Sequence, residues 1–145
     1  MQHVAIMRGS WGLLPKILSG EKVIESRWYQ HKYRPWSAIK PGEWIYFKNS
    51  GQPVTARAKV TRVLQFVDLT PDKVRELLNT YGSADGLDER DIPAFYARFK
   101  EKRYCMLIFL CDAESVAPFH VSKAGFGAMA AWLTVNSIDN IRVDR

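Results

Sequence analysis

The chain has 145 residues, of which 47% are hydrophobic and 25% are charged, and its formal net charge is +6. This length fits one domain with a real core, expected over residues 1–145, and no apolar run approaches the ~20 residues that span a bilayer, which argues against a membrane protein. No signal peptide is recognisable at the start, and Cys105 and Cys111 are spaced too far apart for a disulfide within one strand, so we expect a reduced, cytoplasmic protein.

The positive charge is concentrated in one half of the chain. Residues 1–67 contain eleven Lys and Arg against three Asp and Glu, whereas residues 68–145 contain ten against twelve. A basic region can concentrate a polyanion and contact its phosphates. The alternative is a solvated basic surface without a partner, because runs of charge are often only surface.

The first elements along the chain are a strand and a short helix. The apolar run His3–Met7 predicts a central strand. A helix follows over Ser10–Ser19, with Ser10 as its N-cap and Gly20 as its C-terminal stop. Arg8 stands between these elements, either as a phosphate contact or as a surface charge, and the surface role is favoured.

A period of two residues begins after Gly20. If residues 22–28 are extended, one face of the strand carries Lys22, Ile24, Ser26 and Trp28, and the other carries Val23, Glu25 and Arg27. A carboxylate beside a guanidinium group at a strand edge predicts a site.

Residues 29–40 form a loop in which aromatic rings alternate with cations, including Arg34 and Trp36. This composition suits a single strand of nucleic acid, because bases stack on rings while cations hold phosphates. The alternative is that Trp28 and Trp36 pack as core at one end of the sheet. The two roles are weighed equally, and at least one ring is expected to be structural.

Two strands follow this loop. After a turn at residues 41–43, Trp44–Lys48 reads as a strand, and a turn at residues 49–53 leaves Lys48 and Ser50 at its end. Residues 54–66 alternate as one long strand that carries Arg57 on its polar face. The alternation slips after Val60, which predicts a bulge that lets the strand curl around a barrel.

The second half begins with two helices, which we expect to be packing elements. One starts at Thr70 and ends at Gly82, and the other starts near residues 91–93. Tyr104–Cys111 predicts a strand buried on both faces, and residues 119–121 a separate short strand. A glycine-rich loop then carries Lys123, for which a role in the cleft is favoured, and a turn of helix opening there would offer N–H groups to an anion.

Other chemistries find little support. The three histidines are scattered, and no Cys or His group has the spacing of metal ligands, so we expect no metal and no cofactor. No nucleophile elbow of the G-x-S-x-G type is present, which disfavours a classical nucleophilic hydrolase.

The region around Gly20 resembles a known family. Gly20, Lys22, Glu25 and Arg27 match the G-x-K-x-x-E-x-R signature of the ASCH (activating signal cointegrator homology) domain, a branch of the PUA-like superfamily, and the order of elements agrees over residues 3–66. The resemblance implies an α+β fold, a small PUA-like mixed β-barrel with flanking α-helices and a cleft over the signature strand. Family members are thought to bind RNA or DNA, and a few act on nucleic acid or modified nucleosides.

The resulting hypothesis is a nucleic-acid-binding domain with a basic cleft, more suited to RNA or a single strand than to DNA duplex. Phosphates or a base edge would be contacted by Lys22, Arg27, Lys48, Arg57 and Lys123, with Arg34 and Ser50 beside them. Trp28 and Trp36 would stack on bases, and Glu25 would orient Arg27 or accept a base amino group. The oligomeric state stays open.

Two alternatives are kept. A bacterial branch of the family deacetylates acetylcytidine with a Lys, a Thr and a Glu, so Lys22 and Glu25 could act in a hydrolase for a modified nucleoside or in a ribonuclease. Glu25 stands where that branch has Thr, and a Lys–Glu pair raises the pKa of the lysine, which favours an anchoring cation over a base. The other alternative is a module that recognises a protein or modified peptide.

Overall fold

The computed structural model describes residues 1–143 and is built around one curled, seven-stranded sheet. Six strands follow the order β2-β5-β4-β3-β1-β6, and β7 pairs with the far end of β5. The strands are β1 (Gln2–Met7), β2 (Ile24–Tyr29), β3 (Trp44–Asn49), β4 (Val54–Phe66), β5 (Tyr104–Val121), β6 (Trp132–Val135) and β7 (Arg142–Val143). Only β1 and β3 run parallel among these paired strands.

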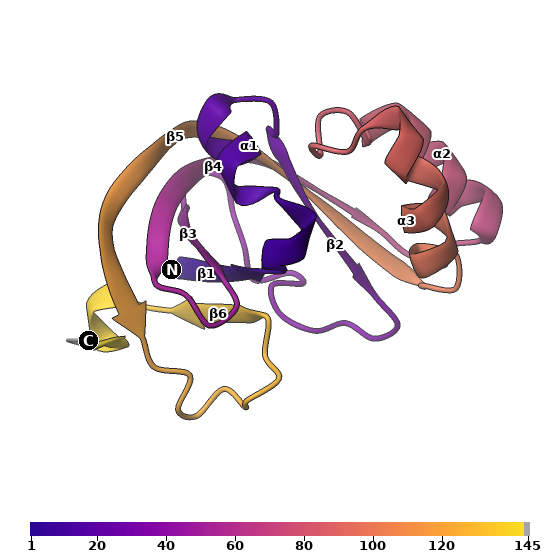
Figure 1. The fold of residues 1–145 in the computed structure, drawn as a ribbon. Coiled ribbons are helices and arrows are strands. Elements are labelled where there is room, and N and C mark those ends of the chain that lie inside the picture. The colour runs from indigo at the N-terminus through magenta and orange to yellow at the C-terminus, as the bar shows by residue number, and fades with distance from the viewer. Residues whose placement is uncertain (144–145) are drawn as a thin grey trace.

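The curl comes from the two longest strands, β4 and β5, which arch together across the molecule (Figure 1). Their register shifts at three places, one of them between Val60 and Arg62. A bulge adds a residue on one strand and increases its bend, so the sheet closes into a half-barrel. The bulge predicted after Val60 is confirmed, as is the α+β architecture of a curled mixed sheet with flanking helices.

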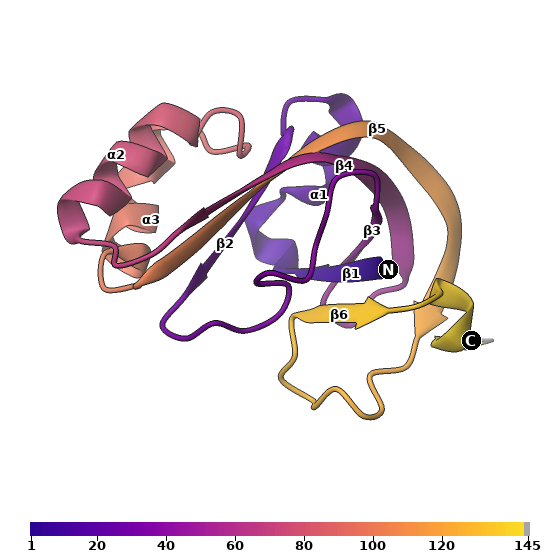
Figure 2. The same ribbon diagram turned by 180° about the vertical axis from the view of Figure 1, so that it is seen from behind.

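The helices lie on the concave side of the sheet and at both of its ends (Figure 1). They are η1 (Gly9–Trp11), α1 (Leu14–Ser19), α2 (Pro71–Tyr81), η2 (Glu89–Asp91), α3 (Ile92–Phe99) and η3 (Ile138–Asn140). Figure 2 shows α2 and α3 at the end of the sheet opposite β6 and the C-terminus. Among residues 1–143, no helix has the length and apolar character needed to cross a membrane.

Capping explains where two helices begin and end. Gly20 has φ of 84° and ends α1, in the left-handed conformation that glycine adopts without a steric penalty. Thr70 caps α2 by accepting a hydrogen bond from the Lys73 amide, and Pro71 follows at the first helical position. The helix predicted over Ser10–Ser19 begins later than expected, because Gly12 (φ 64°) interrupts this segment and Leu13, rather than Ser10, precedes α1.

Two predictions about the second half were wrong. Residues 104–121 form one strand instead of two, since the polar, exposed segment between the apolar ends still pairs through its backbone, Glu114 lying opposite Arg57. No helical turn opens after the glycine-rich loop, because Trp132–Val135 instead pairs with β1 as β6.

Both cysteines are free, but only Cys105 belongs to the core, while Cys111 is half-buried.

Candidate functional site

A cavity of about 270 Å³ lies between β2, η1 and α3. Its lining comes from five parts of the chain, namely the end of β1 with η1, the strand β2 with Lys22 before it, the turn after α2, α3 with the residues after it, and Ala131 just before β6. The lining residues are Ile6, Met7, Arg8, Trp11, Leu13, Lys22, Glu25, Ser26, Arg27, Trp28, Tyr29, Asp85, Leu87, Phe95, Arg98, Phe99, Lys102 and Ala131.

Lys22 lies at the bottom of this cavity and is only 2% exposed. Its ammonium group donates to the carbonyl oxygens of Ile24 (2.6 Å) and Asp85 (2.8 Å) and to the Asp85 carboxylate (2.5 Å), and lies 3.1 Å from Glu25 Oε1. Burial disfavours the charged form, but the carboxylates of Asp85 and Glu25 outweigh it and raise the pKa of Lys22. Lys22 is therefore a charged cross-link between β2 and the turn after α2.

Glu25 extends this network toward the cavity surface. Its Oε2 accepts hydrogen bonds from Arg27 Nε (3.2 Å) and Nη2 (2.8 Å). Burial alone would raise the pKa of Glu25, but Lys22 and Arg27 together hold it below the ordinary value. Arg27 also donates to the carbonyl oxygen of Ala131 (3.3 Å) and lies over the ring of Trp132. Both carboxylate oxygens of Glu25 are therefore held, one by Lys22 and the other by Arg27.

Asp85 holds the other side of the network. Besides Lys22, its carboxylate accepts a hydrogen bond from Ser26 Oγ (2.5 Å), which in turn accepts one from Trp28 Nε1 (3.1 Å). Burial, with the nearby charge of Glu25, raises the pKa of Asp85 despite the opposing effect of Lys22. This hydrogen-bond chain fixes the Trp28 ring against the cavity.

Aromatic side chains form the walls of the cavity. The rings of Trp28 and Phe99 are stacked, with centroids 5.0 Å apart and planes 6° apart. On the other side, Trp11 meets Phe95 edge to face at 5.1 Å. Both contacts join α3 to the first part of the chain, so the walls need both halves of the protein.

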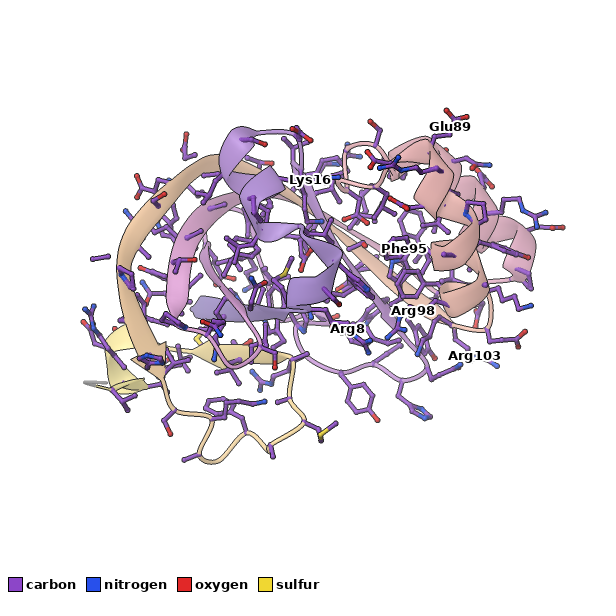
Figure 3. The ribbon with its side chains drawn as sticks, in the orientation of Figure 1. Arg8, Lys16, Glu89, Phe95, Arg98 and Arg103 are labelled. Atoms are coloured by element: carbon purple, nitrogen blue, oxygen red, sulfur yellow. The ribbon has the colours of Figure 1, made fainter. Side chains whose placement is uncertain are left out.

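The mouth of the cavity is basic. Arg8 and Arg98 are exposed, Lys102 is half-buried, and all three line the cavity. Figure 3 shows Arg8 beside Phe95 and Arg98, between η1 and α3. The complete lining contains five basic side chains and two carboxylates, so the cavity is attractive to an anion.

The cavity brings together four of the ten residues predicted for the site: Lys22, Glu25, Arg27 and Trp28. The other six do not line it. Trp36 packs on Tyr104, and Arg34 accepts a hydrogen bond from Tyr29 through its carbonyl oxygen. Arg57 pairs with Glu114, Lys48 is buried in β3, Ser50 lies in the following turn, and Lys123 donates to the Ala128 carbonyl oxygen.

Two predictions about the site need correction. Lys22 was placed on the face opposite Glu25, but it precedes β2, so strand alternation does not apply and its ammonium group reaches both Glu25 and Asp85. The helices of the second half were treated as packing elements alone. Their connecting turn supplies Asp85, and α3 supplies Phe95, Arg98 and Phe99 to the cavity.

The most important residue missed was Asp85, because a carboxylate in a turn carries no periodic signal. A weak signal exists in the glycine that follows it. Gly86 has φ of 86°, and a Cβ there would lie 3.1 Å from the Lys22 Cβ, so the turn needs glycine to close over the lysine.

Comparisons with known proteins agree with this architecture. No protein-family model matches the chain, and no curated protein sequence matches it. Its structure is similar to that of the ASCH protein from Zymomonas mobilis, with a TM-score of 0.67 and 16% identity, over 96% of this chain and 90% of that chain. Two single-residue variants of that protein match with the same TM-score and identity. The chain therefore shares the fold of that ASCH protein.

Proposed function

We propose that this protein binds single-stranded nucleic acid, RNA in preference to DNA, by taking one unpaired base into the cavity between β2, η1 and α3. The observation that carries the proposal is the combination of aromatic walls and a basic mouth around about 270 Å³ of space. Unpaired bases stack on aromatic side chains while cations hold phosphates, and each stacked base contributes roughly 1–3 kcal/mol. The resemblance to ASCH domains, which are thought to bind RNA or DNA, supports nucleic acid as the ligand.

The state of Lys22 supports binding over hydrolysis. A lysine acts as a base or nucleophile through the lone pair of its neutral amine. Here the ammonium group has four oxygen neighbours for three N–H groups, and its pKa is raised. The proposed role of Lys22 is to hold Glu25 and Asp85 in place, so that the floor presents fixed acceptors to the edge of a base.

The predicted contacts outside the cavity would meet only a longer ligand. Trp36, Arg57 and Lys123 would touch a strand that extends past the bound nucleotide, as would Arg34 and Ser50, whereas Lys48 is buried and would not. Binding of a single nucleotide is therefore expected to be independent of these six side chains.

The test is to fill the mouth of the cavity without disturbing its floor. Ala131 is exposed and lines the cavity, so Ala131→Trp should block a base, whereas Ala124→Trp, in the same exposed loop but outside the cavity, is the matched control. Fluorescence anisotropy with single-stranded RNA of about ten nucleotides should show a loss of affinity of about tenfold or more for Ala131→Trp alone.

Other outcomes decide against the proposal. Equal affinities of both variants would place the ligand elsewhere. Turnover of a modified nucleoside or cleavage of the RNA would favour the hydrolase that uses Lys22 and Glu25. Binding of a protein partner without any dependence on salt would favour an interaction module.

A further inference from the structure

Two arginines from distant parts of the chain lie over one tryptophan ring at the mouth of the cavity. Arg8 comes from the end of β1 and Arg98 from α3, and their guanidinium carbons are 5.3 Å and 5.2 Å from the Trp11 ring centroid. Both side chains are exposed and, with Lys102, they line the cavity.

No carboxylate neutralises this group within residues 1–143. Neither Arg8, Arg98 nor Lys102 takes part in an ion pair there. The two acids of the cavity are already engaged, Glu25 by Lys22 and Arg27, and Asp85 by Lys22 and Ser26. Like charges held beside one another without a counter-charge repel, and a bound anion removes that repulsion.

A second tryptophan in the same chain shows what a purely structural arrangement looks like. Trp44 on β3 also has two cations over its ring, Arg57 at 4.1 Å and Lys59 at 5.8 Å. Arg57, however, is paired with Glu114 through a 2.6 Å hydrogen bond from its Nε, and Trp44 does not line the cavity. The cations at Trp11 differ in lacking a carboxylate and in facing an open space.

We propose that Arg8, Arg98 and Lys102 form a phosphate subsite for the nucleotide whose base occupies the cavity. This inference rests on the proposed function, because it takes the base to lie between the aromatic walls. Guanidinium groups bind phosphate oxygens through pairs of parallel hydrogen bonds, which gives direction as well as charge. The ligand class is thereby narrowed to a nucleoside that carries a phosphate, as a free nucleotide or as part of a strand.

The experiment compares matched ligands in matched variants. Quenching of tryptophan fluorescence would be titrated with the four ribonucleosides, their 5′-monophosphates, a dinucleoside monophosphate and a single-stranded RNA of about ten nucleotides. The proteins are wild type, Arg8→Gln/Arg98→Gln and the control Arg62→Gln/Arg75→Gln, whose two exposed arginines lie over the rings of Phe109 and Tyr96 and do not line the cavity. Because Arg8 and Arg98 are exposed, their replacement should leave the urea midpoint close to that of wild type, which verifies folding.

The expected result is a phosphate advantage that depends on the two arginines. Wild type and the control should bind a monophosphate about tenfold or more tightly than the nucleoside, and Arg8→Gln/Arg98→Gln should abolish that difference without changing nucleoside affinity. For the RNA, the plot of log K against log salt should be less steep for Arg8→Gln/Arg98→Gln than for wild type. The slopes should differ by about 1.4, at about 0.7 for each lost contact.

Failures of the two proposals can be told apart. Equal affinity of wild type for nucleoside and monophosphate, or an advantage that survives in Arg8→Gln/Arg98→Gln, would overturn the subsite alone. Arginine-dependent binding of monophosphates without binding of the dinucleotide or RNA would support the subsite and overturn binding of a strand. Failure of wild type to bind any phosphate-bearing ligand would overturn both.

Discussion

Lys22 and Lys48 are both buried, at 2% and 8% exposure, yet their surroundings are opposite. Lys22 is held by two carboxylates, and its pKa is raised. Among residues 1–143, the Lys48 side chain takes part in no hydrogen bond or ion pair, and burial, with the nearby charge of Lys123, lowers its pKa. A buried charge without a partner lowers the stability of the fold, whereas a buried charge paired with carboxylates helps to hold the fold together.

The largest expected effect is that of removing the charge of Lys22. Lys22→Met should lower the free energy of unfolding by about 3–5 kcal/mol, because it leaves the buried carboxylate of Asp85 without a counter-charge and leaves Glu25 with Arg27 alone. Urea unfolding followed by circular dichroism measures the loss. A loss below about 1 kcal/mol would mean that the ion pairs of Lys22 contribute little to the stability of the fold.

The matched control also removes the carboxylate of Asp85, which Lys22→Met leaves without a counter-charge. Lys22→Met/Asp85→Leu should recover part of the loss, because it removes the carboxylate that has lost its counter-charge while Glu25 keeps Arg27 as its partner. Strict additivity of the two single substitutions would contradict direct coupling between Lys22 and Asp85.

The second prediction concerns alkaline pH, where the two lysines should act in opposite directions. The raised pKa of Lys22 means that its contribution to stability is fully present below the ordinary value of 10.5 and is lost as pH rises through the folded-state pKa. The lowered pKa of Lys48 means a penalty at lower pH, which is relieved as pH rises through its folded-state pKa.

Side-chain NMR of the two lysines tests the order of deprotonation. Over about pH 8 to pH 11, the Lys48 signal should shift first, and the Lys22 signal should stay at its charged position beyond the ordinary pKa. Assignment rests on Lys22→Met and Lys48→Met, each of which removes one signal. The reverse order would invalidate the contrast between the two sites.

The smallest expected effect is that of Lys48→Met. Because this side chain has no carboxylate partner within the described residues, an apolar replacement of similar length should change the free energy of unfolding by less than about 1 kcal/mol, in the stabilising direction. The same urea experiment measures it. Destabilisation comparable to that of Lys22→Met would reveal a contact that makes Lys48 structural.

What the sequence could predict follows local patterns. The alternation of residues 22–28 predicted a strand there, observed as β2, and the phase slip after Val60 predicted the bulge of β4, since both depend on neighbours along the chain. The signature Gly20, Lys22, Glu25 and Arg27 correctly indicated the family fold, and three of its members line the cavity. Local patterns are therefore enough to locate one wall of the site.

What the sequence could not predict depends on how the helices of the second half pack against the first half. Asp85 is 63 residues from Lys22, and only the packing of α2 and its following turn against β2 brings the two together. Arg98 and Phe99 face the cavity because α3 packs across η1 and β2, and a helix shows which residues share a face but not what that face will meet. The six predicted contacts outside the cavity were grouped by charge, which does not specify position.

The pairing of β1 with β6 has a consequence for how the protein is made. Val4 lies opposite Leu133, so β1 leaves the ribosome long before the strand that covers one of its edges. Pairings between such distant residues slow folding, and an apolar strand with an open edge can associate with other chains meanwhile. A nascent chain stalled before Trp132 would therefore expose β1 as a site for aggregation or for chaperones.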